Sequence, residues 1–464
     1  MDNTPASVVI LGLARQGAAL ARFFAERGAR VTLSDMRQSD VLQAALTELD
    51  DLQIQYVLGA HPMSLLDNCD LLCLSGGVPT DLPLVQAASQ RGIPLSNDAQ
   101  EFLRRSPAPV VGITGSAGKT TTTTLVGTML AEADFTTWVG GNIGNPLIND
   151  LPAIQATDRV VMELSSFQLE IMTGPEAVSP QVACVLNITP NHLDRHKTMA
   201  AYIAAKRNIV AYQKEGYIAV LGYDEPNARA LATSTAARIR YVSGYAEPNE
   251  GSFLRGDVLV LRREGYEIEV GQRADIRLRG FHNVVNVLAA IALADAAGAP
   301  VDAMQRAIAS FKGVAHRLEE VRRWKGVLWV NDSIATAPER VLADLSAFEE
   351  PLILLAGGRD KDLPWEALAQ QVVKRVRVLI TFGEAAGLIR EHVERARQRY
   401  SAQSQDMVLE DVIAGETLEG AVQHAARCAR SGEVVLLSPG GTSFDAFQDF
   451  AARGERFREL THNL

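Results

Sequence analysis

Residues 111–124 read Val-Gly-Ile-Thr-Gly-Ser-Ala-Gly-Lys-Thr-Thr-Thr-Thr-Thr. The apolar run 109–113 leads into this stretch, and apolar residues at Leu125 and Met129 continue after it with helical spacing. An apolar strand, a glycine-rich turn and a helix, in that order, are typical of a loop that binds phosphate. The stretch therefore predicts that the chain handles a nucleoside triphosphate.

The residue types in this loop fit polyphosphate chemistry. Gly115 and Gly118 let the backbone turn sharply and approach an anion closely, and the start of the helix directs N–H groups at it. Lys119 can neutralise phosphate charge, while Thr120 can offer its hydroxyl to Mg²⁺. Gly112 lies one residue too far upstream for the full Walker A spacing, so the motif is Thr-Gly-x-x-Gly-Lys-Thr. The alternative is a chance Gly-Lys-Thr in a loop, which the flanking strand and helix disfavour.

The composition is that of a globular protein of several domains. A chain of 464 residues, 47% hydrophobic and 22% charged, is expected to form about two to four domains. The net charge of −10 argues against general nucleic-acid binding. We find neither an apolar run long enough to cross a bilayer nor a secretion signal. Cys69 and Cys73 have no second such pair, which disfavours a zinc or disulfide framework. We therefore expect a cytoplasmic protein with small-molecule substrates and with neither nucleic-acid nor membrane partners.

Short apolar strands alternate with helical stretches along the chain, which predicts an α/β protein with parallel, doubly wound sheets. The first block carries a predicted helix over 18–27 and three predicted strands, at 8–12, 31–34 and 70–74. Turns follow these strands, and ligands bind at the carboxyl ends of strands in such sheets. The stretch 107–109, Pro-Ala-Pro, predicts a linker.

Two further blocks repeat this rhythm. The second carries predicted strands at 159–164, 182–187 and 217–221 and a helix over 283–296. The third carries predicted strands at 327–330, 352–356, 378–382 and 434–438. We expect three domains: an N-terminal doubly wound nucleotide-binding sheet (1–106), a central P-loop ATPase domain (107–314) and a C-terminal Rossmann-like domain (315–464).

Three side chains after the phosphate loop are candidates for chemistry. Glu163 follows a predicted strand, where a carboxylate beside a phosphate loop suits Mg²⁺, although an isolated glutamate is more often simply exposed. His192 lies in the polar stretch 187–196, and Lys206 ends a Tyr-x-x-Ala-Lys pattern. Taken alone, such a stretch is more often a polar turn and such a lysine a solvated charge.

In combination, these motifs resemble a known family. Thr-Gly-x-x-Gly-Lys-Thr, Glu-x-Ser-Ser-x-Gln, Asn-x-Thr-x-x-His-x-Asp and Tyr-x-x-Ala-Lys, in this order, are similar to the central ATPase domain of the Mur ligases. Those enzymes use ATP to add amino acids to the peptide stem of the peptidoglycan precursor. The resemblance continues at 280–286, at His316 and Arg317, and at 331–336. Folylpolyglutamate synthases share the central pattern, but the two ends of this chain fit them poorly.

The ends resemble the family members that add glutamate to UDP-N-acetylmuramoyl-L-alanine. The stretches that carry this likeness are 12–17, 35–37, 75–77 and the Ser-Pro-x-x-x-Ser-Phe-Asp-x-Phe signature at 438–447. The resemblance implies an ATP-dependent amide ligase in which the muramoyl carboxylate becomes an acyl phosphate and the amine of D-glutamate displaces phosphate. It also implies ATP and Mg²⁺ as cofactors, and we expect a monomer.

The resemblance assigns roles to individual residues. Catalytic roles fall on Lys119, Glu163, His192 and Lys206. Metal ligands would be Thr120, Glu163, His192 and a carbamylated Lys206. Contacts with ATP would come from Gly115, Ser116, Ala117, Gly118, Lys119, Thr120, Thr121, Asn283, Asn286, Arg317 and Asp332. Contacts with the UDP substrate would come from Arg15, Gln16, Asp35, Arg37, Gly77, Asn142, Ser165 and Gln168. The glutamate pocket would hold Thr336, Lys361, Ser443 and Phe450.

One departure from the family pattern leaves the amino acid open. Ile334 replaces a lysine that is common in the family's Asn-Asp-Ser-Lys-Ala-Thr, so a charge near the glutamate is missing. An L-glutamate ligase of the same family is therefore an alternative. A non-catalytic nucleotide-binding scaffold of the same fold is a second alternative, because a fold does not fix a function. The complete set of Lys119, Glu163, His192 and Lys206 argues against the scaffold.

Overall fold

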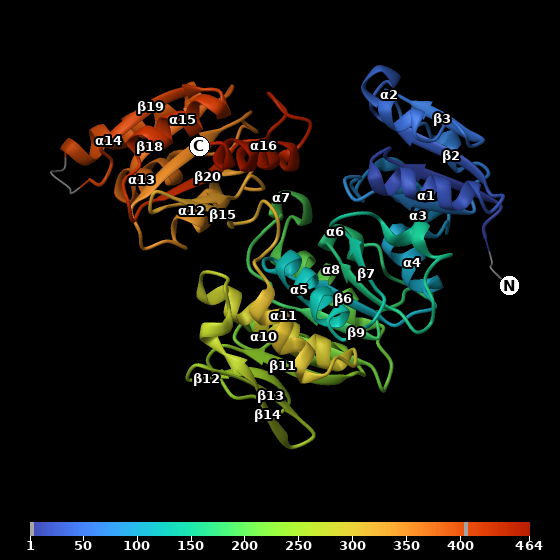
Figure 1. The fold of residues 1–464 in the computed structure, drawn as a ribbon. Helices are drawn as coiled ribbons and strands as arrows, with labels where there is room; N and C mark the ends of the chain where they lie inside the picture. The colour runs from blue at the N-terminus through green and yellow to red at the C-terminus, as the bar shows by residue number, and fades with distance from the viewer. Residues whose placement is uncertain (1–3, 403–406) are drawn as a thin grey trace. The chain divides into compact units, whose positions relative to one another are not determined.

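The computed structural model describes residues 4–402 and 407–464, and they form three mostly parallel sheets with helices between the strands (Figure 1). The secretion-signal prediction falls partly on residues 1–3, which lie outside the described residues. Within the described ranges, no helix combines the length and the apolar character that a membrane span requires. The α/β class and the three-domain organisation predicted above are confirmed.

The N-terminal sheet has the order β3-β2-β1-β4-β5, with every described pairing parallel. Alternate residues of β1 face opposite sides, as strand geometry requires. Val8 and Ile10 pack in the cluster that contains α1, while Val9 and Leu11 pack against α3. The elements are β1 Ser7–Leu11, α1 Arg15–Ala25, β2 Arg30–Asp35, α2 Ser39–Thr47, β3 Ile54–Leu58, β4 Leu71–Leu74, α3 Pro83–Gln90, β5 Leu95–Ser96 and α4 Asp98–Arg105.

The central sheet has nine strands in the order β14-β13-β12-β11-β10-β9-β6-β8-β7. Strands β12 to β14 pair antiparallel, and the other described pairs are parallel. The strands are β6 Val110–Thr114, β7 Thr137–Gly141, β8 Arg159–Glu163, β9 Val182–Val185, β10 Ile218–Gly222, β11 Arg238–Ser243, β12 Gly251–Arg255, β13 Val258–Arg263 and β14 Tyr266–Gln272. The helices are α5 Lys119–Ala131, α6 Ser166–Leu169, α7 Leu193–His196, α8 Met199–Ala211, α9 Pro226–Ala230, α10 Phe281–Ala296 and α11 Val301–Ser310.

The C-terminal sheet has the order β15-β16-β20-β17-β18-β19, and only the edge pair β15–β16 is antiparallel among its described pairings. Its two faces are separate apolar layers, one with α12, α13 and α14 and the other with α15 and α16. The strands are β15 Glu319–Trp324, β16 Val327–Asn331, β17 Leu352–Gly357, β18 Val376–Phe382, β19 Asp411–Glu416 and β20 Val434–Gly440. The helices are α12 Pro338–Leu345, α13 Glu366–Arg375, α14 Ala386–Ala402, α15 Leu418–Cys428 and α16 Phe450–His462.

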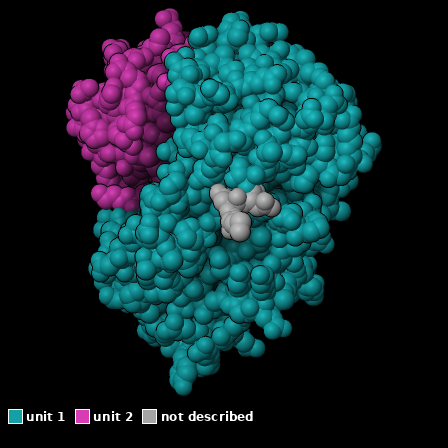
Figure 2. Space-filling model, turned by 90° about the vertical axis from the view of Figure 1, so that its right-hand side faces the viewer, with its two compact units in different colours: residues 1–277, 281–311 teal, residues 278–280, 312–464 magenta. Residues whose placement is uncertain are grey.

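The chain forms two compact units (Figure 2). Residues 1–277 and 281–311 make the first, which contains the N-terminal and central sheets, and residues 278–280 and 312–464 make the second. The boundaries 106/107 and 314/315 stay predictions.

The strands and helices at the phosphate loop lie within a residue or two of their predicted positions, but two kinds of prediction were wrong. The helix predicted over 18–27 begins at Arg15 and ends at Ala25, because it starts from Ala14 without a side-chain cap that the sequence would reveal. Edge strands such as β3, which is short and only partly buried, and the antiparallel β12–β14 arm, where charged residues interrupt the apolar pattern, were not predicted.

Candidate active site

The phosphate loop joins β6 to α5 and requires glycine at two positions. Gly118 has a φ of 84° and precedes the first residue of α5, and a Cβ there would lie 2.2 Å from Oδ1 of Asn286. A Cβ on Gly115 would lie 3.0 Å from Cβ of Leu186. At both positions a side chain would crowd a neighbouring segment, so glycine lets the loop pass close to Leu186 and Asn286.

Asn187, two residues after the end of β9 at Val185, holds the loop in shape. Its carbonyl oxygen accepts from the Ser116 N–H at 2.9 Å, and its Oδ1 accepts from the Ala117 N–H at 2.9 Å. The Ser116 hydroxyl donates to the Thr189 carbonyl and also lies 3.0 Å from the Tyr202 hydroxyl. Asn187 was not among the predicted site residues, although it follows a predicted strand in a polar stretch of the sequence.

Thr120, Glu163 and Asn142 meet at the carboxyl ends of neighbouring strands. Oγ1 of Thr120 donates to Oε2 of Glu163 at 2.8 Å, and Nδ2 of Asn142 donates to Oε1 of the same carboxylate at 2.7 Å. Glu163 is only 2% exposed. Lys119, the first residue of α5, donates from Nζ to the Gly115 carbonyl at 3.0 Å. A hydroxyl and a carboxylate are the hard oxygen donors that suit Mg²⁺.

Lys206 projects from α8 into the same region and is buried. Its Nζ donates to Oγ1 of Thr114 at 3.2 Å and to the Gly115 carbonyl at 3.0 Å. Burial lowers the pKa of Lys206 well below its ordinary 10.5, the charge of Lys119 lowers it further, and Glu163 opposes the shift. Burial thus favours the neutral form of the amine, which is its nucleophilic form.

His192 precedes α7 in a left-handed conformation, with a φ of 53°. Its ring meets the edge of Phe167 with the ring centroids 5.1 Å apart. Among the described residues, no three His, Cys, Asp or Glu side chains gather as a metal site. The predicted Mg²⁺ ligands do not need a cluster of this kind, because they include Thr120 and a modified Lys206. The metal site stays a prediction.

Asp35 is the centre of the predicted UDP region. Its carboxylate accepts from the Leu13 N–H at 2.7 Å and from two nitrogens of the Arg37 guanidinium at 2.8 and 2.9 Å. Burial works to raise the pKa of Asp35, but the hydrogen bonds from Arg37 and from backbone N–H groups lower it to about 2. Arg37 is thus fixed beside the turn that follows β1.

The other predicted UDP contacts surround this turn. Oε1 of Gln16 accepts from the Gly76 N–H at 3.0 Å, and Nη1 of Arg15 donates to the Gly144 carbonyl at 2.6 Å. Gly77 is exposed, and a Cβ there would meet nothing within 4 Å. The structure therefore brings Arg15, Gln16 and Gly77 to the carboxyl end of the N-terminal sheet.

Ser165 and Gln168 form a capping box at the start of α6. The side chain of Gln168 is fully buried, and its Nε2 lies 3.3 Å from Oδ1 of Asp98. Burial raises the pKa of Asp98 to about 6, although Gln168 opposes the rise. In this arrangement Gln168 ties the N-terminal and central sheets together.

In the second unit, Lys361 and Thr336 lie together. Nζ of Lys361 donates to Oγ1 of Thr336 at 3.3 Å, and burial lowers the pKa of Lys361, helped by the charges of Arg340 and Arg453. Ser443 is buried, and Phe450 starts α16 with 36% of its surface exposed.

A buried arginine that the sequence analysis missed organises this part of the second unit. The guanidinium of Arg453 donates to the Ser333 hydroxyl and carbonyl and to the Gly441 carbonyl. It thereby joins α16 to the loops after β16 and β20. The sequence around Arg453 indicates a helix rich in charged residues, but it does not indicate that this side chain is buried.

The predicted ATP contacts divide between the two units. In the first unit, Nδ2 of Asn286 donates to Oδ1 of Asn283 at 3.0 Å. In the second, Oδ1 of Asp332 accepts from the Leu318 N–H at 2.5 Å. Burial raises the pKa of Asp344 well above its ordinary range, and the neighbouring Asp332 raises it further. Arg317 lies in the same unit, in the loop before β15.

Comparison with known proteins places this site in a family. The Mur ligase middle domain matches residues 113–294, a MurD-like N-terminal domain matches 6–97, and the Mur ligase glutamate ligase domain matches 316–441. The chain belongs to the Mur ligase family. Mur ligases are ATP-dependent enzymes, in agreement with the phosphate loop.

Curated Mur ligases match the chain over its full length. The UDP-N-acetylmuramoylalanine–D-glutamate ligase of Symbiobacterium thermophilum is 40% identical over 98% of this chain and 97% of its own. The ligase of the same name from Geotalea uraniireducens is 42% identical over 100% and 99%. The solved UDP-N-acetylmuramate–alanine ligase MurC of Thermotoga maritima matches at a TM-score of 0.58 and 18% identity, over 98% of this chain and 99% of its own, which shows a shared fold.

Proposed function

We propose that this protein is an ATP-dependent ligase that joins D-glutamate to UDP-N-acetylmuramoyl-L-alanine in peptidoglycan precursor synthesis. The full-length identity to Mur ligases that carry this activity in their names is the observation that carries the proposal. The Thr120–Glu163 contact supports it, because it places oxygen donors that suit Mg²⁺ beside the phosphate loop.

The reaction must activate a carboxylate, which is a poor electrophile. An oxygen of the muramoyl-alanine carboxylate attacks the γ-phosphorus of ATP, and ADP leaves. The amine of glutamate then attacks the acyl carbon, phosphate leaves, and the amine gives up a proton as the amide forms. The first step brings two anions together, so it depends on positive charge that is already in place.

The residues of the first unit meet this need. The glycines and the N-terminus of α5 offer N–H groups to the phosphates. The Lys119 ammonium stabilises the negative charge of the γ-phosphate during its transfer. Thr120 and Glu163 would hold Mg²⁺, whose charge would shield the reacting anions from each other. Their oxygen donors fit this ion, and His192 is proposed as a ligand of a second Mg²⁺.

Lys206 fits a further role as a carbamate. The neutral amine attacks the carbon of carbon dioxide, an N–C bond forms, and the amine proton passes to water. The product is an anionic oxygen donor, whereas an unmodified ammonium would repel a metal ion. The low pKa that burial imposes on Lys206 favours this reaction.

The predicted binding residues that remain are assigned to the muramoyl nucleotide and to glutamate. The muramoyl nucleotide would bind at Arg15, Gln16, Asp35, Arg37 and Gly77, with Asn142 reaching its alanyl end. Glutamate would bind at Thr336, Lys361, Ser443 and Phe450, where Lys361 can pair with a carboxylate. We further propose that the protein acts as a cytoplasmic monomer.

A measurement of phosphate release distinguishes an ATP-dependent ligase from a non-catalytic nucleotide-binding scaffold. Release from ATP should require both UDP-N-acetylmuramoyl-L-alanine and glutamate, and either one alone should give only background. ATP binding without release under any combination would favour the scaffold.

A further inference from the structure

Arg195 lies three residues after His192 and has no role in the function proposed above. Its Nη2 donates to the Glu170 carboxylate at 2.5 Å and to the Val78 carbonyl at 2.8 Å. Nη1 lies 3.5 Å from the Gly77 carbonyl. The Arg195 and Glu170 side chains are only 16% and 13% exposed, so solvent screens this pair little. A single guanidinium thus connects the loop after β4 with the loop that carries His192.

The same guanidinium is coupled to His192 through an aromatic ring. It lies over Phe167, 4.8 Å from the ring centroid. Phe167 meets the His192 ring edge-on at 5.1 Å and stacks on His196 at 5.6 Å. A cation over an aromatic face attracts it, so Arg195 restrains Phe167, and Phe167 restrains His192.

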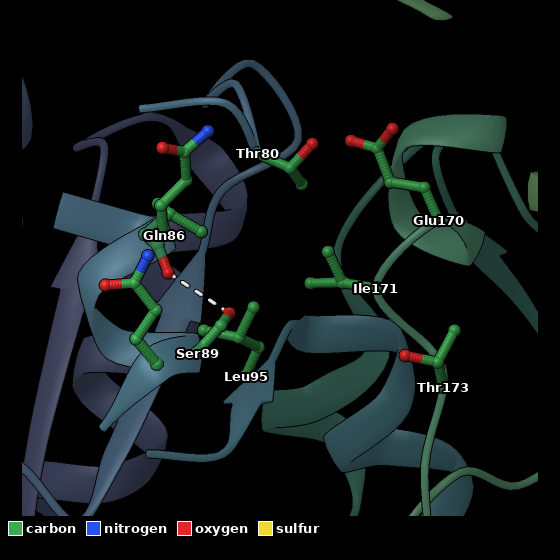
Figure 3. Close-up of a pocket in the computed structure, with 9 residues that line it drawn as sticks. Thr80, Gln86, Ser89, Leu95, Glu170, Ile171 and Thr173 are labelled. Atoms are coloured by element: carbon green, nitrogen blue, oxygen red, sulfur yellow. Dashed lines mark hydrogen bonds between the residues drawn. The ribbon is translucent and has the colours of Figure 1, made fainter. Parts of the chain in front are cut away.

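Beside this contact, the N-terminal and central sheets are separated by an open crevice of about 570 Å³ (Figure 3). Thr80, Gln86 and Ser89 line one side, and Glu170, Ile171 and Thr173 line the other. Ile171 also joins Leu74 and Val85 in one buried apolar cluster, so the two sheets are in direct apolar contact at this junction. The polar contacts of Arg195 add a separate connection, to the backbone of Gly77 and Val78.

Other contacts hold the two sheets together elsewhere. Nδ2 of Asn97 donates to the Gln168 carbonyl at 2.8 Å, and Arg104 pairs with Glu176 at 2.6 Å. A shared apolar cluster also runs through both sheets. Loss of the Arg195 side chain should therefore leave the fold intact. It should increase the mobility of the loop at Gly77 and of the loop that carries His192.

We propose that Arg195 is a positioning residue that fixes the loop binding the muramoyl nucleotide relative to the loop carrying His192. The inference rests on the proposed function, because the first loop delivers the carboxylate that must meet the γ-phosphate. Reacting atoms have to approach to about 3–3.5 Å, and a misplacement of about 1 Å can slow a reaction by about 100-fold. Arg195 touches neither reacting group and acts through Phe167 and the backbone of Gly77 and Val78.

The test compares Arg195→Met with Arg104→Met, which breaks another ion pair between the same two sheets. Arg195→Met should lower kcat by about 10- to 100-fold, raise the Mg²⁺ concentration for half-maximal rate, and leave the KM for ATP unchanged. Calorimetric binding of UDP-N-acetylmuramoyl-L-alanine and the Tm should stay close to wild type. Arg195→Lys should recover only part of the rate, because an ammonium cannot span the contacts of a planar guanidinium. Arg104→Met should keep the wild-type kcat.

A double variant distinguishes two causes of a lower kcat, the loss of positioning by Arg195 and the unpaired charge that is left on Glu170. Arg195→Met leaves the largely buried Glu170 carboxylate without its guanidinium partner, with Nδ1 of His196 still 3.5 Å away, and this loss is itself destabilising. Arg195→Met/Glu170→Gln removes that charge, and the proposal predicts that it stays as slow as Arg195→Met. Recovery of the wild-type kcat in the double variant, or equal losses in Arg195→Met and Arg104→Met, would overturn the proposal. A wild-type protein without ligase activity would instead overturn the proposed function, which the same assay detects first.

Discussion

Thr120 and Glu163 are joined by a 2.8 Å hydrogen bond between the first turn of α5 and the end of β8. This contact places a hydroxyl and a buried carboxylate next to the phosphate loop. It exists because β6 and β8 are parallel neighbours, so their carboxyl ends lie at one edge of the sheet. The chemistry we propose is concentrated at this edge.

Lys119→Ala should abolish ligation without unfolding the protein. The substitution removes positive charge that the phosphoryl transfer needs, and loss of such a group typically costs about 100- to 1,000-fold in rate. Steady-state phosphate release with all substrates measures the effect. Lys214→Ala, at an exposed lysine of the same unit, is the matched control and should react at the wild-type rate. Near-normal turnover by Lys119→Ala would refute the assignment of the phosphate loop.

Lys206→Ala should be nearly inactive, and formate or acetate in the buffer should restore part of the rate. The added carboxylate would replace the carbamate oxygen donors in the space that the shortened side chain leaves. For the wild type, a carbamate signal in ¹³C NMR after addition of labelled bicarbonate provides direct evidence. An unmodified lysine in a complex with ATP, Mg²⁺ and the muramoyl nucleotide would speak against this role.

Asp35→Asn should weaken muramoyl-nucleotide binding and lower the Tm at pH 7. The pKa of Asp35 is lowered to about 2 from the ordinary 3.8, so its stabilising effect is complete above about pH 4 and is lost as the pH falls through 2. The difference in Tm between wild type and variant should therefore shrink between pH 4 and pH 2. Asp67→Asn removes a more exposed ion pair and serves as the control. A Tm difference that stays constant across this range would contradict the pKa assignment.

Lys361→Ala should raise the KM for glutamate much more than the KM for ATP. Lys361 lies 3.3 Å from Oγ1 of Thr336, and an ammonium at this position can pair with a substrate carboxylate. Lys374→Ala, at an exposed lysine of the same unit, should change neither constant. The opposite substitution, Ile334→Lys, should lower the KM for glutamate, since it supplies a charge common in the family. An unchanged KM in Ile334→Lys would show that position 334 does not face the glutamate.

The sequence predicted those parts of the site that depend on local order. A glycine before Lys119 at the start of a helix, and acidic residues at strand ends such as Asp35 and Glu163, follow from patterns a few residues long. The support of Asn187 for the phosphate loop depends on a contact between segments about 70 residues apart. The burial of Lys206 and the contacts of Arg195 depend on packing between distant segments in the same way. No local pattern could reveal them.

Parallel assays with D- and L-glutamate test the central claim most directly. Wild-type protein with UDP-N-acetylmuramoyl-L-alanine, ATP and Mg²⁺ is given each isomer, and the product is identified by mass spectrometry and by the chirality of its released glutamate. We predict rapid formation of the D-glutamyl product and little or no reaction with L-glutamate. Faster turnover of L-glutamate would contradict the account and assign the protein to the L-glutamate ligases of the family.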